Sequence, residues 1–294
     1  MVFIFWLKIL ATFAFADHVT LNFYPTPYGI KWNSPGNLAR TVVLNQLAKE
    51  GRKIGHASVE VACGVEGKPG YERIMAGMVQ SDDNLSFKNL LFKNGYGFGI
   101  LFHDFNGYME TKEDLELELE NRSSHGNMSF LRVDISPTTC KRLLDYHKEY
   151  QQLGFDRHYG LVNRPRYREG AGCTAFATSV LDVGGLLDSE WTQAWNKTIR
   201  IPEKYIGGPS TGRHVKFLKI ALLFAHDRWA TEDEPHRKLS FWDPDEMHRW
   251  LKRTWNQEKK SPTGTYELFY RGKAKGLRVN RTWVPTPNDS FWRE

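Results

Sequence analysis

Hydrophobic residues alternate with polar or small residues in several short segments of the chain, which predicts β-strands. Two such segments, residues 54–63 (IGHASVEVAC) and 71–80 (YERIMAGMVQ), flank the turn-rich sequence GVEGKPG. Together they predict a hairpin with a loop. We expect further strands over residues 95–105, 115–120, 129–136 and 215–225. Residues 95–105 and 129–136 are expected to pair with each other. Residues 115–120 are predicted to form a strand because Leu alternates there with Glu.

Helical spacing and capping residues mark other segments. The clearest helix begins at Pro137, with Ser136 as its N-cap and Gly154 as its terminator. Others are expected over residues 37–50, from Cys173 onward, and over residues 244–257 behind the Asp243 cap. This mixture predicts an α+β fold in which an antiparallel sheet is covered by the helix that carries Cys173.

The expected domain organisation has three parts. Residues 1–16 read as a signal peptide, residues 17–205 as the main domain, and residues 206–294 as a C-terminal extension or small second domain. The boundary falls in a Gly-, Pro- and Ser-containing loop at about residues 205–213. Sequence alone leaves open whether the last part extends the same sheet.

The N-terminal segment MVFIFWLKILATFAFA is apolar, carries one lysine and ends in the small-x-small sequence Ala14-Phe15-Ala16. This pattern is typical of a cleaved secretory signal and predicts a periplasmic or secreted protein. The second choice is an uncleaved anchor, which the segment is short for because a spanning helix needs about 20 apolar residues. Three cysteines, Cys63, Cys140 and Cys173, are too few for a disulfide scaffold, and pairing of Cys63 with Cys140 stays open.

The net charge rules out few functions, but it does affect which binding partners we expect. The formal net charge is +6, and the basic residues are scattered without one concentrated run. We therefore expect no nucleic-acid partner, since no recognised binding motif accompanies the charge. A diffuse positive field suits an anionic cell-envelope polymer, or peripheral contact with a membrane or cell wall.

Cys173 carries the candidate chemistry. It stands after the small residues of EGAG, where a helix is expected to begin. A helix N-terminus offers unpaired N–H groups and a positive dipole end, which lower a thiol's pKa and can stabilise an oxyanion. The alternative is a small buried hydrophobe, the commoner role of a single cysteine.

His56 is the best-placed base for such a thiol. It follows Gly55 at the start of a predicted strand, and alternation places it on one face with Ser58 and Glu60. Continuing the hairpin brings residues 78–80 opposite His56, which makes Gln80 the candidate that orients the ring. The pair His103-Asp104 is a second candidate for that third position.

The segments GHASVEV and YGLVNRPRYREGAGCTAFA give the order histidine strand, polar strand, long insertion, cysteine helix. This order resembles the circularly permuted papain-like proteins, the NlpC-related branch that includes lecithin retinol acyltransferase-like enzymes, over about residues 50–190. The resemblance implies Cys173 as nucleophile, His56 as base and Gln80 as a possible third residue. It also implies a cysteine hydrolase that cleaves an amide, such as a peptidoglycan peptide bond, or an ester.

Two alternatives share the fold: a non-catalytic protein that binds envelope material, and an acyltransferase that passes the acyl group to an acceptor other than water. The hydrolase chemistry needs no metal or organic cofactor, and the acidic stretch at residues 226–236 has no standard zinc spacing. Arg164, Arg166 and Arg168 precede Cys173 and are expected either to bind a carboxylate-rich substrate or to be solvated loop charges.

Overall fold

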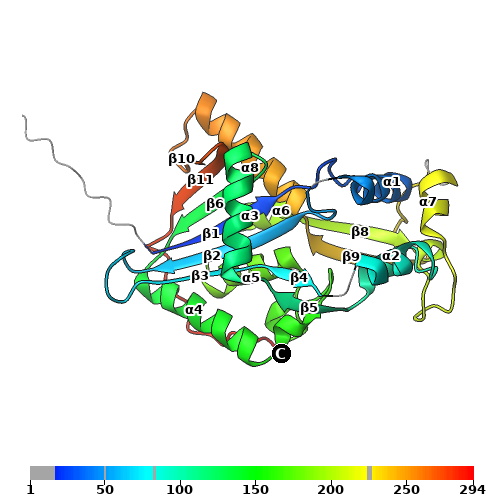
Figure 1. Ribbon diagram of the computed structural model, residues 1–294, viewed down its shortest axis with the longest axis horizontal. Helices are drawn as coiled ribbons and strands as arrows, with labels where there is room; N and C mark the ends of the chain where they lie inside the picture. The colour runs from blue at the N-terminus through cyan, green and yellow to red at the C-terminus, as the bar shows by residue number, and fades with distance from the viewer. Residues whose placement is uncertain (1–16, 50, 82–83, 224–226) are drawn as a thin grey trace, which may run out of the picture.

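A computed structural model describes residues 17–49, 51–81, 84–223 and 227–294. The fold is α+β (Figure 1). Its strands are β1 (His18–Tyr24), β2 (His56–Cys63), β3 (Glu72–Ala76), β4 (Met78–Gln80), β5 (Phe105–Met109), β6 (Ser129–Asp134), β7 (His158–Tyr159), β8 (Asn196–Pro202), β9 (His236–Trp242), β10 (Glu267–Arg271) and β11 (Ala274–Asn280). The expected signal peptide, residues 1–16, lies outside the described residues.

The α-helices are α1 (Pro35–Leu47), α2 (Asn84–Phe92), α3 (Lys112–His125), α4 (Pro137–Gln152), α5 (Cys173–Val183), α6 (Ser189–Trp195), α7 (Phe217–Leu223) and α8 (Pro244–Lys260). Short 3-10 helices span Phe98–Phe102, Phe155–Arg157, Pro165–Tyr167 and Glu203–Tyr205. Within the described part of the chain, none of the helices has the length and hydrophobicity needed to span a bilayer.

The central layer is a six-stranded sheet in the order β10-β11-β6-β1-β2-β3, and β11 runs parallel to β6 while the other neighbours are antiparallel. Alternating residues of β1 divide between its faces. Val19, Leu21 and Phe23 join the core formed with α4, α5 and α8, whereas Tyr24 faces the smaller core beneath α3. Figure 1 shows α3 crossing one face of this sheet. The last strands, β10 and β11, therefore extend the main sheet.

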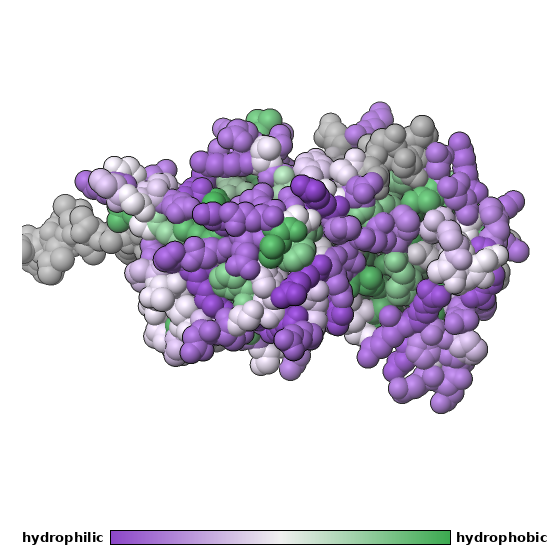
Figure 2. Space-filling view, turned by 90° about the horizontal axis from the view of Figure 1, so that it is seen from below, coloured by the Kyte–Doolittle hydropathy of each residue, from purple (hydrophilic) through white to green (hydrophobic). Residues whose placement is uncertain are grey.

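A second body of structure lies beside this sheet. It is built from α1, α2, α7 and the β8-β9 pair, which Figure 1 shows together at the right. These elements enclose their own hydrophobic core, with Leu38, Phe98, Ile201 and Phe241 among its members. On the face drawn in Figure 2, most of the surface is hydrophilic, and hydrophobic residues are exposed in a recess between the two parts.

Several predicted elements are confirmed. The helix over residues 137–153 is α4, with the Ser136 side chain accepting a hydrogen bond from Thr139 N–H and Gly154 in the left-handed region. Cys173 begins α5, and Asp243 caps α8. The helix expected over residues 37–50 is α1, which begins slightly earlier, at Pro35, because Ser34 caps it.

Two predicted strands are wrong, because both are helices. Residues 115–120 lie in α3, which begins behind the Thr111 cap and ends at the left-handed Gly126. The Leu–Glu alternation suggested a strand, but Leu115 and Leu119 are also four residues apart, which places them on one face of a helix. Both are buried, while Leu117 between them is exposed. Residues 215–225 likewise contain α7, whose buried Phe217, Ile220 and Ala221 have helical spacing.

The predicted strand at residues 95–105 is also wrong. Its middle, Phe98–Phe102, forms a 3-10 helix, and the strand begins only at Phe105. Its expected partner, residues 129–136, does form β6, but β6 pairs with β1 and β11. Three glycines in GYGFG allow close approaches: an added Cβ at Gly97 would lie 2.5 Å from the Tyr205 carbonyl oxygen.

The predicted hairpin is confirmed for β2 and β3, where Val59 pairs with Ala76 and Cys63 with Glu72. The ladder then stops, and the chain leaves at Gly77 so that β4 pairs with β5 in a different sheet. The predicted opposition of residues 78–80 to His56 is therefore wrong. This departure determines which residue reaches His56.

Cys63 and Cys140 form a disulfide that ties β2 to α4. The two residues are 77 apart in sequence, and closing a loop of that length restricts the unfolded chain enough to stabilise the fold by roughly 4 kcal/mol in the chain-entropy account. Cys173 is the remaining thiol of the three cysteines and is buried.

Candidate active site

Cys173 stands at the first position of α5. Gly172 precedes it as the N-cap and supplies no side-chain cap, so the first-turn N–H groups of the helix keep no side-chain partner there. An added Cβ at Gly172 would lie 3.1 Å from the Gly160 carbonyl oxygen, which explains a glycine at this close approach. The thiol is 6% exposed and lines a cavity, so a ligand there would meet it.

His56 begins β2, the strand against which α5 packs. Its ring is buried, stacks on Tyr24 at a centroid distance of 5.7 Å, and hydrogen-bonds with the Cys173 side chain. The sequence-based pairing of Cys173 with His56 thus has the two side chains in contact. The Ala57 N–H also donates to the Cys173 sulfur.

Glu110 is the third member of this cluster, and sequence reasoning missed it. Its Oε2 lies 2.8 Å from His56 Nε2, an ion-pair separation, although the angle at this contact falls outside hydrogen-bond geometry. Nε2 faces Glu110, which leaves Nδ1 as the ring nitrogen available to Cys173. Glu110 lies between β5 and α3, and its own N–H donates to the Gly77 carbonyl, which holds it beside the end of β3.

The pKa values of the cluster favour an ion pair. Burial raises the pKa of Cys173, but the hydrogen bond and positive charge of His56, together with the Ala57 N–H and Arg52, outweigh it and lower that pKa. Burial and Arg52 lower the pKa of His56, while Cys173 and Glu110 raise it, and the net pKa is raised. Both directions shift the pair toward thiolate and imidazolium and away from the neutral thiol and imidazole.

Arg52 supports the carboxylate from its other side. It contacts Glu110 Oε1 and also Glu118 of α3, and Glu118 in turn bonds Arg122. Burial raises the pKa of Glu110, but the close contact with His56 and its positive charge, with Arg52, lower it to about 2. Glu110 is therefore ionised across the physiological pH range.

Gly77 makes room for this contact. A Cβ added at that position would lie 2.5 Å from Glu110 Oε2 and 3.0 Å from His56 Nε2. A side chain there would displace one of the two groups, so the departure of the chain from the β2-β3 ladder and the glycine at that point both serve the His56-Glu110 contact.

Tyr159 is a further residue that sequence reasoning missed. It lies on β7, and its hydroxyl hydrogen-bonds with the Cys173 sulfur. Burial and the negative charge of Cys173 raise the pKa of Tyr159 well above its usual range, which keeps the hydroxyl protonated as a donor. No local motif distinguishes this tyrosine, and only the fold brings β7 to α5.

Among the residues that the structure describes, neither Gln80 nor the pair His103-Asp104 forms a hydrogen bond or ion pair with His56. Gln80 lies on β4 and lines both the Cys173 cavity and a shallower pocket beside His56. Asp104 instead accepts from His158 and Asn163 on the surface. Their assignment as the residue that orients His56 is replaced by Glu110, whose carboxylate is the group in contact with the ring.

The arginine loop before Cys173 is paired within the protein. Arg164 bonds Glu169 and lies over the Tyr167 ring, while Arg166 is buried among Asp182, Asp289 and carbonyl oxygens of residues 290–291. Arg168 takes a left-handed conformation at the end of a 3-10 helix and is exposed. None of the three lines the Cys173 cavity, although Arg164 and Arg166 line a neighbouring pocket, and their expected role in binding substrate stays a prediction.

The acidic stretch after residue 226 also pairs locally. Asp227 accepts from Lys204 and Tyr205, and Glu234 forms an ion pair with Arg228. His226 lies outside the described residues. Among the residues that the structure describes, no cluster of three or more His, Cys, Asp or Glu side chains is arranged to hold a metal ion.

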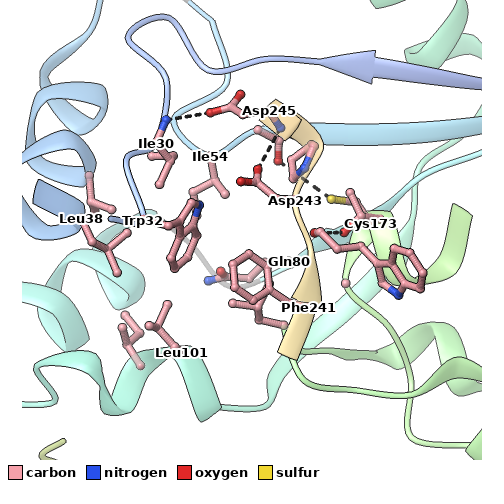
Figure 3. Close-up of a pocket in the computed structure, with 18 of the residues that line it drawn as sticks. Ile30, Trp32, Leu38, Ile54, Gln80, Leu101, Cys173, Phe241, Asp243 and Asp245 are labelled. Carbon is pink, nitrogen blue, oxygen red and sulfur yellow. Dashed lines mark hydrogen bonds between the residues drawn. The ribbon is translucent and has the colours of Figure 1, made fainter. Parts of the chain in front are cut away.

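A cavity of about 140 Å³ opens beside Cys173 (Figure 3). Its wall is mostly apolar and comes largely from the second body of structure: Ile30, Leu38, Leu91, Phe98, Phe217 and Phe241. Tyr159 and Gly172 line it at the Cys173 side, and Asp243 at the start of α8 lines it further along. The nucleophile candidate therefore stands at one end of an apolar chamber.

Asp243, Pro244 and Asp245 position this wall. Asp245 accepts hydrogen bonds from the N–H groups of Thr26 and Ile30, which holds the loop after β1 against α8. Pro244 lies against Gly55, where an added Cβ would come within 2.7 Å of the proline ring. The start of α8 is thus fixed directly beside the strand that carries His56.

No protein-family model, curated protein or solved structure matches this chain. The function of the site must therefore be inferred from the geometry of its own residues.

Proposed function

We propose that this protein is a cysteine hydrolase with a permuted papain-like core, cleaving an amide or ester bond through Cys173. The observation that carries the proposal is the contiguous cluster Cys173-His56-Glu110, in which a thiol at a helix N-terminus meets a buried imidazole held by an ionised carboxylate. A nucleophile, a base and a group that orients the base are the parts such chemistry requires.

The reaction follows from these parts. The Cys173 thiolate attacks the substrate carbonyl carbon, and the His56 imidazolium gives its proton to the leaving nitrogen or oxygen as the bond breaks, which forms a thioester. Neutral His56 then takes a proton from water, whose oxygen attacks the thioester. The acid product leaves, and the thiolate and imidazolium are restored. First-turn N–H groups of α5 are the donors available to the carbonyl oxygen as it becomes negative.

An oxidising compartment fits this enzyme, which supports export to the periplasm or outside the cell. The disulfide between Cys63 and Cys140 is of the kind that persists outside the cytoplasm. Cell-envelope peptides head the list of proposed substrates, with acyl groups second; the apolar cavity beside Cys173 is compatible with either. The net charge of +6 suits contact with an anionic envelope.

The experiment is hydrolysis by the purified protein of a fluorogenic peptide library and of p-nitrophenyl esters, alongside Cys173→Ala and His56→Ala. We expect turnover that both substitutions abolish, and mass spectrometry should detect an acyl group on Cys173 after rapid acid quenching. Turnover that persists in Cys173→Ala would disprove the assignment. An inert thiol with intact binding of envelope fragments would favour the non-catalytic binding protein, and acyl-group transfer to an added amine or alcohol in preference to water would favour the transferase.

A further inference from the structure

Two polar atoms in the wall of the Cys173 cavity have no hydrogen-bond partner among the residues that the structure describes. They are Oδ2 of Asp243, an acceptor when ionised, and Nε1 of Trp32, a donor. Buried polar atoms are nearly always paired, so an unpaired donor and acceptor in one cavity call for an explanation. Figure 3 shows the Trp32 indole nitrogen and the free oxygen of Asp243 on facing sides of the same space, beside Ile54.

The two oxygens of the Asp243 carboxylate have different surroundings. Its Oδ1 accepts from the Asp245 N–H and caps α8, which fixes the side chain in place. Its Oδ2 lies 3.9 Å from Arg249 Nη2, which is beyond hydrogen-bond distance. The residue is 2% exposed, so water does not reach it from bulk solvent as it would reach a surface carboxylate.

The rest of the cavity sets the size and polarity of the ligand. About 140 Å³ of mostly apolar space is close to that of an engineered cavity of 150 Å³ that holds a benzene molecule. A phenyl ring or a branched aliphatic side chain fits this volume, whereas a long acyl chain exceeds it. An apolar group alone would leave Asp243 and Trp32 unpaired.

We propose that this cavity binds a hydrophobic amino-acid residue of a peptide, with a peptide N–H donating to Asp243 and a peptide carbonyl accepting from Trp32. A peptide unit carries one donor and one acceptor beside its side chain, which are the two kinds of group that Asp243 and Trp32 can pair with. The proposal rests on the proposed function, because it takes Cys173 at the cavity end as the attacking atom. It also gives residues 206–294 a role, since Phe217, Phe241 and Asp243 come from that part of the chain.

The test measures binding without catalysis. The full-length Cys173→Ala protein is titrated calorimetrically at pH 8.5 with N-acetyl-L-phenylalaninamide and with 2-acetoxy-3-phenylpropanamide, in which an ester oxygen replaces the donor N–H. We expect the amide to bind about tenfold more tightly, the usual worth of one hydrogen bond to a charged group. In an added Asp243→Asn substitution the ratio should fall to about one, because the atom that accepts is replaced by an NH₂ group.

The Asn variant keeps an oxygen for the α8 cap, so it should fold. Asp188→Asn, which caps α6 away from the cavity, is the matched control and should leave the ratio unchanged. Trp32→Phe, which keeps an aromatic ring but removes the N–H, should weaken both probes.

Equal affinity for the two probes, an unchanged ratio in Asp243→Asn, or no binding of either probe at millimolar concentration would each overturn the proposal. These outcomes are separable from failure of the proposed function, which is judged by Cys173 reactivity in the wild-type protein. A reactive Cys173 thiol in a protein that binds the two probes equally would contradict this inference and leave the proposed function standing.

Discussion

At the scale of single residues, the site depends on how Glu110 and Arg52 hold the charge of His56. Glu110 raises the pKa of the ring and Arg52 lowers it, while Arg52 also keeps Glu110 ionised. Against burial and Arg52, the carboxylate in contact with Nε2 favours the imidazolium together with Cys173. A protonated ring in turn keeps Cys173 as a thiolate.

Glu110→Gln removes that negative charge while keeping the side chain's shape. The pKa of His56 should fall and the pKa of Cys173 should rise, so the ion pair exists over a narrower pH range. We expect at least a tenfold slower alkylation of Cys173 at pH 7, and a larger loss of hydrolysis. Glu118→Gln is the control, because it removes a second carboxylate from Arg52 without removing the one against His56. Equal effects of the two substitutions would argue against a specific role for Glu110.

At the scale of elements, the site forms at the junction of β3 and β4, where the chain passes from one sheet to another. Continuing the hairpin by alternation placed Gln80 opposite His56, but the ladder ends at Ala76 and Glu110 enters from the segment before α3. A strand that changes sheets brings a residue distant in sequence to the end of β2, which no local pattern predicts.

Gly77→Ala tests this junction. The added methyl group would lie against Glu110 Oε2 and His56 Nε2, so we expect a loss of roughly 1 to 3 kcal/mol in the free energy of unfolding, together with lower Cys173 reactivity. Denaturant unfolding and alkylation rates measure the two effects. A Glu110→Ala background removes the closer of these two contacts, so the additional loss of stability should shrink. An undiminished loss there would place the clash elsewhere.

Asp243 at the start of α8 should make stability depend on pH. Burial and the neighbouring Asp245 raise the pKa of Asp243 to about 7, so the folded protein binds a proton more tightly than the unfolded chain. The stability that this proton contributes is fully present below the unfolded pKa of 3.8 and is lost as pH rises through 7. Relative to Asp243→Asn, the wild type should lose roughly 2 to 3 kcal/mol between pH 5 and pH 8. A constant difference in denaturant unfolding would contradict it.

At the scale of the whole molecule, the α+β class and the two central side chains were predictable, and the surroundings were not. Cys173 and His56 carry local signals: small residues before a helix, and a glycine before an alternating strand. The α3 helix was predictable too, since the Thr111 cap, acidic first turn and basic last turn are helix signals that the Leu–Glu alternation obscured. Glu110 and Tyr159 carry no such signal, because their roles arise only where distant segments meet.

The structure of the region after residue 205 was also hard to predict from sequence alone. Its hydrophobic stretch at residues 215–225 has few features that separate strand from helix, and only packing against α1 decides for α7. The parallel pairing of β11 with β6 joins residues almost 150 apart in sequence. The α7 helix contributes Phe217 and β9 contributes Phe241 to the wall of the Cys173 cavity, whereas no residue of β11 lines it.

The most direct test of the central claim is the pH dependence of Cys173 alkylation by iodoacetamide. Because Cys63 and Cys140 are joined, thiol modification of the folded protein reports on Cys173. The account predicts rapid reaction at about pH 6 to 7, well below the range of an ordinary thiol near 8.5, and a much slower reaction in His56→Ala. An inert thiol, or one that reacts like a free cysteine with or without His56, would contradict it.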